Sequence, residues 1–530
     1  MSFETQYLYL VIAALIFLNR IIAYTRRSPL RLPPGPSPLP LIGNTHQIQK
    51  TQTWLQYYAW SKKYGPVMHL NILGQSVIVL SSMKAAQDLL AKKGSAYAER
   101  PRLVNTKYAA ELVMKGLHIT LRPYNARYRL HQRMEAPLLN PGASNSYNKL
   151  QELESKQLLY DLLNSGGDDV GVDFHDPFER MTASTIYALA YGYRLKTGSE
   201  AELAHSRNVQ GEFVKIARTG VFLVDTFPVL NYLPEFLAPW KKEAEILFGR
   251  FRDLHVGNLQ RAFNNPGWNF SKRMRDSTEY KNSEMSIEEL AFDVGELALA
   301  ALDTTTMTMD WFVVAWLTQA QASGFVSEAQ AYLDEIVGRE RPPTYEDRPN
   351  LPYIDAIIEE LLRWRPILPN GLAHSISSED TYEGYRIPPG SVVVPNYWAL
   401  TRDKDVFGED VEVFRPERWL IDDEQTGTQK INDLPTVGFG FGRRICTGRH
   451  IARNSLWIQM ARLLWAFNIE PGVLETGEKV RIDPNESTDE ALVARPLPFN
   501  AVFRPRGQWV QDFIMKDCDT SNVDNVDLGL

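Results

Sequence analysis

The chain has 530 residues, of which 44% are hydrophobic and 23% are charged. This composition is typical of a globular protein and excludes disordered, collagen-like and multi-span membrane chains. Its 57 Lys and Arg against 64 Asp and Glu give a net charge of −7, which argues against a nucleic-acid partner. With only two cysteines, Cys446 and Cys518, the chain cannot build a disulfide framework.

The chain begins with an apolar segment. Residues 7–24 read YLYLVIAALIFLNRIIAY, about the minimum length that crosses a bilayer as a helix. Three arginines follow before residue 32, so the positive-inside rule places the N-terminus in the lumen and the rest in the cytosol. A cleaved signal peptide is one alternative, but no small-residue cleavage site follows the run. We expect residues 1–31 to be an uncleaved single-pass anchor, with an interfacial helix as the other alternative because of Arg20.

A proline-rich stretch separates this segment from the rest. Residues 32–45 begin LPPGPSPLP, which cannot be helical and is stiffened by proline, so we expect a hinge there. A globular body is then expected over residues 46–510. The acidic, polar residues 511–530 are expected to form a flexible tail.

The body is predicted to be mainly α-helical with small β-sheets. Residues 67–81 alternate around Gly74-Gln75 and predict a β-hairpin. Ser286-Ile-Glu-Glu289 is a capping-box pattern before a long proline-free run, which predicts a helix of roughly 50 Å that ends near Ala322. The later elements predicted are a helix over 353–364, a turn and strand over 387–394, and a helix over 447–467.

The strongest chemical signal is the stretch FGFGRRICTG, from Phe439 to Gly448. Its glycines allow the backbone to turn tightly and to approach another group closely. Cys446 is expected at the N-terminal end of a helix, where backbone amides favour a thiolate, with Arg444 nearby. A thiolate is a good ligand for a soft metal centre. A buried structural cysteine stays an alternative, whereas Ile445 in place of a third glycine excludes a phosphate-binding loop.

Two further patterns add acidic and hydroxyl groups. Glu360 and Arg363 share one helix face at i,i+3 spacing, and Arg418 in FRPERW offers a second arginine. Alone, the first two indicate no more than a surface ion pair. Asp303 and Thr304 lie in the middle of the long apolar helix, where polar groups need a partner or a function. The alternative for Thr304 is a hydrogen bond to the preceding turn.

These patterns, in this order and spacing, resemble the cytochrome P-450 superfamily. The heme-loop pattern F-x-x-G-x-R-x-C-x-G is matched by Phe439, Gly442, Arg444, Cys446 and Gly448. The resemblance extends over the anchor, the hinge and the body. The stretches that resemble fungal microsomal members, in particular the O-methylsterigmatocystin oxidoreductase-like enzymes, are residues 225–228, 346–353 and 362–366.

The resemblance implies a cytochrome P-450 fold, with the long central helix over a heme b group in a heme-thiolate catalytic domain. Cys446 would be the axial ligand of the heme iron, and Phe439 would pack beside it. Arg444 and His374 would contact the heme propionates. The other implied residues are Gly442 and Gly448 in the cofactor-binding loop and Glu360, Arg363 and Arg418 in a buried structural ion network.

By the same resemblance, Asp303 and Thr304 match the acid–alcohol pair that relays protons to bound dioxygen. Two departures occur. Ala301 stands where the family usually has glycine, and Tyr128 and Gln132 stand where it usually has a tryptophan and a basic propionate partner. The mostly apolar segments from which substrate contacts are expected are residues 103–120, 211–227, 292–304, 367–373 and the region near Leu492.

The function implied is that of a monooxygenase that inserts one oxygen atom from O2 into a lipophilic small molecule in fungal secondary metabolism. Electrons would come from NADPH through a separate NADPH–cytochrome P-450 reductase, with cytochrome b5 as a further donor, at the endoplasmic reticulum membrane. One alternative is a heme-thiolate enzyme of rearrangement, dehydration or peroxide-dependent oxidation. A second is a non-catalytic heme sensor or electron carrier. A zinc enzyme is disfavoured because the nine histidines form no H-E-x-x-H pattern.

Overall fold

The computed structural model describes residues 30–101, 111–165, 169–216, 228–422, 429–488 and 492–524. The apolar stretch of the predicted anchor, residues 7–24, lies outside these ranges. Within them, no helix has both the length and the apolar character needed to cross a bilayer.

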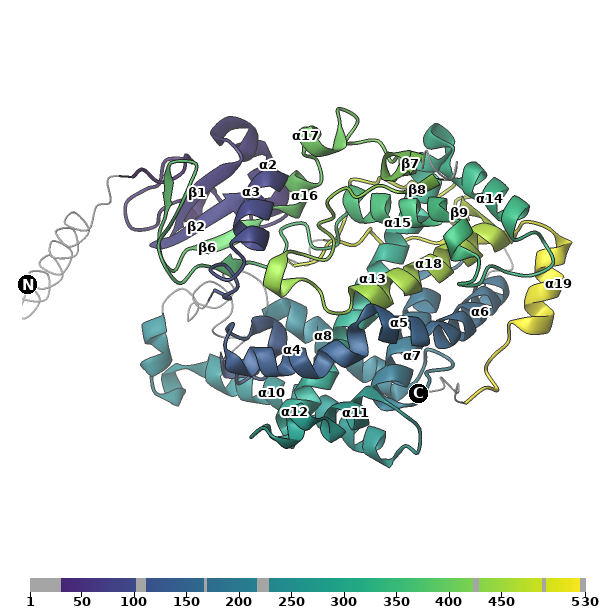
Figure 1. The fold of residues 1–530 in the computed structure, drawn as a ribbon, viewed down its shortest axis with the longest axis horizontal. Helices are drawn as coiled ribbons and strands as arrows, with labels where there is room; N and C mark the ends of the chain where they lie inside the picture. Colours follow the sequence, from purple (N-terminus) through teal and green to yellow (C-terminus); the bar gives the residue numbers. More distant parts are fainter. Residues whose placement is uncertain are drawn as a thin grey trace, which may run out of the picture.

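The described chain is mainly helical (Figure 1). Its longer α-helices are α2 (Thr53–Tyr64), α4 (Ala126–Leu139), α6 (Asn148–Ser165), α7 (His175–Tyr191), α8 (Ala201–Ile216), α10 (Pro239–Asn264), α13 (Ile287–Ser323), α14 (Phe325–Ile336), α15 (Pro352–Trp364), α18 (Arg449–Ala466) and α19 (Gln508–Asp517). The shorter ones are α3 (Met83–Ala86), α5 (Pro141–Ser146), α11 (Phe270–Asp276), α12 (Thr278–Lys281), α16 (Tyr397–Leu400) and α17 (Lys404–Phe407). The strands are β1 (Val67–Ile72), β2 (Gln75–Leu80), β3 (His374–Ser375), β4 (Asp380–Tyr382), β5 (Tyr385–Ile387), β6 (Val392–Pro395), β7 (Leu420–Asp422), β8 (Gln429–Ile431), β9 (Phe467–Pro471) and β10 (Ala501–Pro505).

A four-stranded sheet of order β1-β2-β6-β3 lies at one end of the molecule, and three two-stranded sheets complete the strands (Figure 1). The predicted hairpin is β1 and β2, which pair antiparallel with Ile72 opposite Gln75. Its two turn residues, Leu73 and Gly74, both have positive φ, which is the two-residue turn that matches strand twist. The turn therefore lies one residue earlier than Gly74-Gln75. Strand β6 joins β2 in parallel and carries β3, which contains His374.

Helix α13 crosses the centre of the molecule (Figure 1). The hydroxyl of Ser286 accepts a hydrogen bond from the Glu289 amide at 3.1 Å, so the predicted cap begins the helix. Its 37 residues span about 55 Å, and it ends at Gly324 in the left-handed conformation. Its C-terminal half is buried against α7, α15 and α18, and this core holds the middle of α13 in a fixed position.

The C-terminal segment is ordered, in contrast to the flexible tail expected from residue 511. Helix α19 packs against α6 and β10 through Val510, Ile514 and Cys518, all of which are fully buried. Beyond it, the amide and hydroxyl of Thr520 both donate to the Gln157 side chain, at 2.6 and 3.0 Å. The acidic composition was misleading because the three apolar residues recur at i,i+4,i+8 and form one helix face. The expectation is therefore wrong for residues 511–524.

Candidate functional site

Cys446 lies in the loop that precedes α18. The Cys446 amide donates to the Phe439 carbonyl at 2.8 Å, which closes the loop over residues 439–446. The helix begins at Arg449, three residues after the cysteine, and the Arg449 guanidinium donates to the Cys446 carbonyl at 3.0 Å. The Phe439 ring packs on the main core and faces the Arg453 guanidinium, 4.8 Å from the ring centre. The cysteine is thus presented by a fixed turn at a helix entrance.

Glycine is required at Gly442 for two separate reasons. Its φ is +55°, a backbone conformation that disfavours residues with a Cβ. A Cβ there would also collide with the carbonyl oxygen of Leu90, in the π-helical turn η2 (Gln87–Lys92). At Gly448 a Cβ would instead lie 4.0 Å from the Cys446 sulfur. The loop can therefore pack on η2, while the side chain of Cys446 itself is exposed.

The electrostatics of Cys446 differ from expectation. Although the Cys446 side chain is accessible to solvent, the protein atoms around the sulfur desolvate it and raise the pKa of the thiol, while the amides of Gly448 and Arg449 and the charge of Arg449 oppose this rise. The helix-end amides therefore act in the expected direction but are outweighed. Arg444 does not assist, because its guanidinium is turned toward Ala98 and Arg122, whose carbonyls accept at 2.7 and 2.6 Å. A positive centre at the sulfur would favour its thiolate form.

Arg444 instead belongs to a cluster of donors that contains His374 and Arg100, a residue that the motifs did not indicate. The Arg100 guanidinium is buried and donates to the carbonyls of Thr120, Leu372 and Ala373 at 2.7–3.2 Å. Burial, followed by the charge of Arg444, lowers the pKa of Arg100 to about 10. Burial also lowers the pKa of His374 to about 3, so this imidazole is neutral.

This cluster fits the acidic edge of a heme. Among the described residues, neither Arg100 nor Arg444 forms an ion pair with a carboxylate, and Arg444 Nη1 is buried without a hydrogen-bond partner. The buried Arg100 and the half-buried Arg444 are costly without a counter-ion, and an anionic group would satisfy both. Heme propionates supply such groups, and the exposed Cys446 thiol supplies the axial ligand. The residues present therefore fit the implied cofactor.

The predicted acidic network is assembled around Glu360 on α15. Both of its carboxylate oxygens are buried and lie 2.8 Å from the Arg363 guanidinium. Arg418 donates at 3.1 Å, and the indole N–H of Trp419 at 2.9 Å. The amide of Arg415 adds a fifth hydrogen bond at 2.8 Å. The family resemblance implied Glu360, Arg363 and Arg418, whereas the contacts of Trp419 and of the Arg415 amide were found only in the structure.

Asp303 and Thr304 lie half-buried in the middle of α13. The Thr304 hydroxyl donates to the carbonyl of Ala300 at 2.8 Å, as the structural alternative predicted. This bond fixes the rotamer and leaves the hydroxyl oxygen able to accept a proton donor. The helix is continuous here, with Ala301 half-buried. The arrangement is compatible with both interpretations of Thr304.

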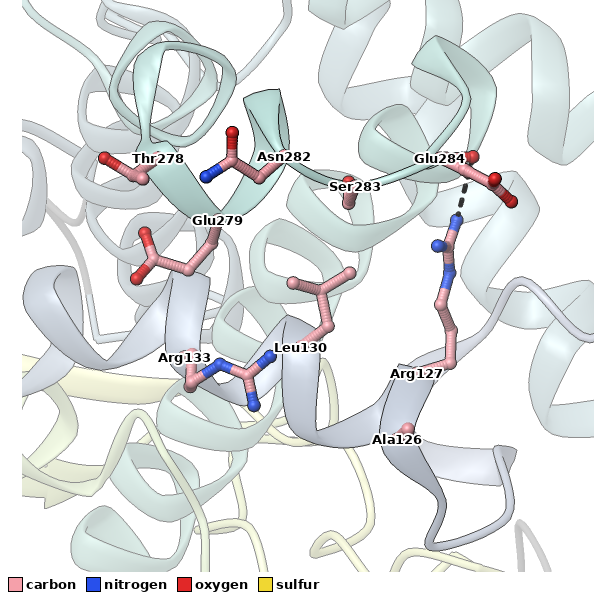
Figure 2. Close-up of a pocket in the computed structure, with 9 residues that line it drawn as sticks. All are labelled: Ala126, Arg127, Leu130, Arg133, Thr278, Glu279, Asn282, Ser283 and Glu284. Atoms are coloured by element: carbon pink, nitrogen blue, oxygen red, sulfur yellow. Dashed lines mark hydrogen bonds between the residues drawn. The ribbon is translucent and has the colours of Figure 1, made fainter.

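Tyr128 and Gln132, which stand at the positions that depart from the family pattern, both take part in contacts near Arg444. The Tyr128 ring lies 3.9 Å beneath the Arg444 guanidinium, and Gln132 donates to the Tyr128 hydroxyl at 3.2 Å. Arg127 forms an ion pair with the Glu289 carboxylate on α13. Figure 2 shows Arg127 and Arg133 at the wall of a surface pocket between α4 and α12. Arg127 is thus part of the interface between α4 and α13.

Similarities to known protein sequences bear on this arrangement. A sequence profile of the family "Cytochrome P450" matches residues 33–501. The cytochrome P450 monooxygenase aneD of Aspergillus aculeatus is 40% identical, over 90% of this chain and 88% of that protein. The cytochrome P450 monooxygenase drtD of Aspergillus calidoustus is 38% identical, over 96% and 92% of the two chains. The cytochrome P450 monooxygenase peniB of Penicillium patulum is 36% identical, over 94% and 89%.

Proposed function

The chain belongs to the cytochrome P450 family and is an oxidoreductase of the monooxygenase type, and we propose that it inserts one atom of O2 into a lipophilic fungal metabolite. The observation that carries this proposal is the accessible Cys446 thiol, two residues after Arg444, together with the absence among the described residues of a carboxylate partner for Arg444 and the buried Arg100. Electrons come from NADPH through a separate flavoprotein reductase, with cytochrome b5 as a further donor.

The chain's own residues perform three tasks in this reaction. Cys446 donates its thiolate, Arg100 and Arg444 hold the propionates, and Thr304 holds a proton donor near the reacting oxygen. A heme held by the Cys446 thiolate would supply oxygen activation and favour O–O cleavage. Positioned groups on α13 deliver the protons that the reaction needs. Asp303, adjacent to Thr304, is the ionisable group that replenishes them.

The location proposed for the enzyme is the endoplasmic reticulum membrane, with residues 1–31 as the anchor. Support comes from the apolar residues 7–24 and from large apolar side chains that the folded domain leaves exposed. Leu41 is 81% exposed, Tyr232 90% and Phe236 83%. Alkaline carbonate extraction of microsomes tests the proposal: the protein should stay in the pellet, and its release would contradict an integral anchor.

The function is tested with the purified holoenzyme. A carbon-monoxide difference spectrum of the reduced protein should show the thiolate-type heme band, and Cys446→Ser should lose it. NADPH oxidation with a purified reductase should then depend on a lipophilic metabolite fraction. Turnover without reductase would favour a rearrangement or peroxide-using enzyme, and absence of turnover with every reductant would favour a sensor or carrier. A folded protein without thiolate character would contradict the role of Cys446.

A further inference from the structure

Residues 117–122 include the end of the first segment expected to contact substrate. They contain the short helical turn η4 (Ile119–Leu121), and the two leucines of this stretch pack against an apolar cluster to which α8, α10 and α13 contribute. Other parts of the expected substrate segments, residues 102–110 and 217–227, lie outside the described chain. The described part of the wall is therefore short, and its position depends on a few contacts.

Two backbone carbonyls of this segment accept hydrogen bonds from the arginines of the propionate cluster. Arg100 Nε donates to the Thr120 carbonyl at 3.0 Å. The Arg444 guanidinium donates to the Arg122 carbonyl at 2.6 Å. Because both donors are charged, these bonds belong to the stronger class of hydrogen bonds. The two arginines therefore hold the segment as well as the edge of the cofactor site.

The same two residues direct donors toward α13. The amide of Thr120 donates to the Glu296 carboxylate at 3.0 Å, and the Thr120 hydroxyl donates to the same oxygen. The Arg122 guanidinium forms an ion pair with Glu289 at 2.8 Å. All three charged side chains are at least nine-tenths buried, so water competes weakly for these contacts. Thr120 and Arg122 thus each connect an arginine of the propionate cluster to a glutamate of α13.

The position of Glu296 relates this segment to the reacting centre. Glu296, Ala300 and Thr304 follow one another at four-residue intervals and share one face of α13. Eight residues of helix correspond to about 12 Å. The segment therefore runs from the edge of the propionate cluster to the part of this face that lies about two turns before Thr304. It forms a wall that a bulky molecule near Thr304 would contact and a small one would not.

We propose that Glu296 is a positioning residue for substrate binding, which acts through Thr120 to fix residues 117–122 against α13. This inference rests on the proposed function, because it concerns molecules that are held near Thr304. A wall that is fixed before binding loses less conformational entropy when a ligand associates with it. Loss of the contact should therefore weaken the binding of molecules large enough to reach the wall, and small molecules should bind as before.

The test compares clotrimazole with imidazole on the holoenzyme. Both place an imidazole nitrogen on the heme iron, but clotrimazole also carries three aryl rings that extend in different directions. Dissociation constants are measured from the shift of the ferric heme band, and wild type should bind clotrimazole much more tightly. Thr120→Val keeps the shape but removes the hydroxyl donor, so it should weaken clotrimazole binding roughly tenfold and leave imidazole binding unchanged. Thr120→Ser, which keeps the hydroxyl, should restore the wild-type ratio of the two constants.

Glu296→Gln tests the other side of the contact. It keeps an oxygen for the Thr120 amide but removes the charge, so it should also weaken clotrimazole binding. The double variant Thr120→Val/Glu296→Gln should lose less than the product of the two single effects, because both substitutions remove the same contact. Glu288→Gln replaces a neighbouring side chain of α13 that is 36% exposed and pairs with Arg252, and this control should bind both azoles as wild type does.

A merely structural contact would lower heme content or the thermal midpoint without changing the ratio of the two dissociation constants. Three results overturn the proposal: equal affinity of wild type for the two azoles, an unchanged ratio in Thr120→Val, or effects that multiply in the double variant. If Glu296→Gln does not load heme, Thr120→Val alone decides between these outcomes. A wild-type protein without a thiolate heme spectrum would instead refute the proposed function.

Discussion

At the scale of single residues, Arg100 carries a role that its sequence context does not reveal. Arg100→Gln retains donors for the surrounding carbonyls but removes the buried charge, which has no carboxylate partner among the described residues. We expect heme content per mole of protein to fall several-fold, because a propionate loses its charged partner, while the apoprotein stays folded. A hemochromogen assay against protein concentration measures this. Arg129→Gln, an exposed neighbour on α4, is the control, and equal heme content in both variants would contradict the assignment.

Glu360 is the residue whose loss should damage the fold most. Glu360→Ala leaves the Arg363 and Arg418 guanidinium groups buried without their carboxylate, a defect of about 3–5 kcal/mol in the free energy of unfolding. We expect apoprotein or aggregate on expression. Glu245→Ala breaks the pair with Lys115, whose side chains are 68% and 41% exposed, so it should change the free energy of unfolding by no more than about 1 kcal/mol. Normal heme content in Glu360→Ala would defeat this prediction.

Thr304 is where the two interpretations of one contact diverge in function. Thr304→Ala removes the hydroxyl that donates to the Ala300 carbonyl. If this hydroxyl holds a proton donor, NADPH oxidation should continue in the variant while the yield of product falls and the yield of hydrogen peroxide rises. Thr304→Ser should restore coupling. Thr308→Ala, which removes the equivalent back-bond one turn later, is the matched control. Coupling in Thr304→Ala that equals wild type would support a purely structural hydroxyl.

At the scale of elements, the sequence predicted the helix ends that are determined by neighbouring residues. The cap of α13 at Ser286 and the end of α15 before Pro366 follow from neighbouring residues, and both were predicted. Of the cluster of Arg100, Arg444 and His374, the resemblance implied the last two and missed Arg100, whose contacts with Leu372 and Ala373 arise only from tertiary packing. Spacing can indicate a motif, but it cannot show which way the Arg444 guanidinium turns.

Helix α19 is the element for which composition gave the wrong answer, and it can be tested directly. Ile514 is fully buried against the core, so Ile514→Ala should lower the free energy of unfolding by about 2–5 kcal/mol. Met515, the next residue, is 52% exposed, and Met515→Ala should change it by no more than about 0.5 kcal/mol. Thermal unfolding of the two variants measures the difference. Similar midpoints would mean that α19 contributes little to the folded state.

At the scale of the whole molecule, α13 joins two different kinds of interior. Its C-terminal half lies in the apolar core, whereas its N-terminal half meets α4 through a buried ionic network. His131 of α4 lies at the centre of this network, 2.9 Å from Glu289 and 2.8 Å from Asp293. Arg122 also pairs with Glu289, at 2.8 Å. The attachment of α4 to the rest of the protein therefore depends on protonation.

This dependence predicts how stability varies with pH. Burial alone would lower the pKa of His131, but Asp293 and Glu289 raise it from 6.5 to about 9. A group whose pKa is higher in the folded than in the unfolded protein stabilises the fold fully when the pH is below its unfolded-state pKa. This stabilisation is lost as the pH rises through its folded-state pKa. We therefore expect up to about 3 kcal/mol of stability to be lost between pH 6.5 and pH 9. His131→Gln should lack this loss, whereas His46→Gln, at an exposed site, should retain it. The measurement is the thermal unfolding midpoint of each protein across this pH range. If the midpoints of wild type and His131→Gln changed with pH in parallel, His131 would not be protonated in the folded protein.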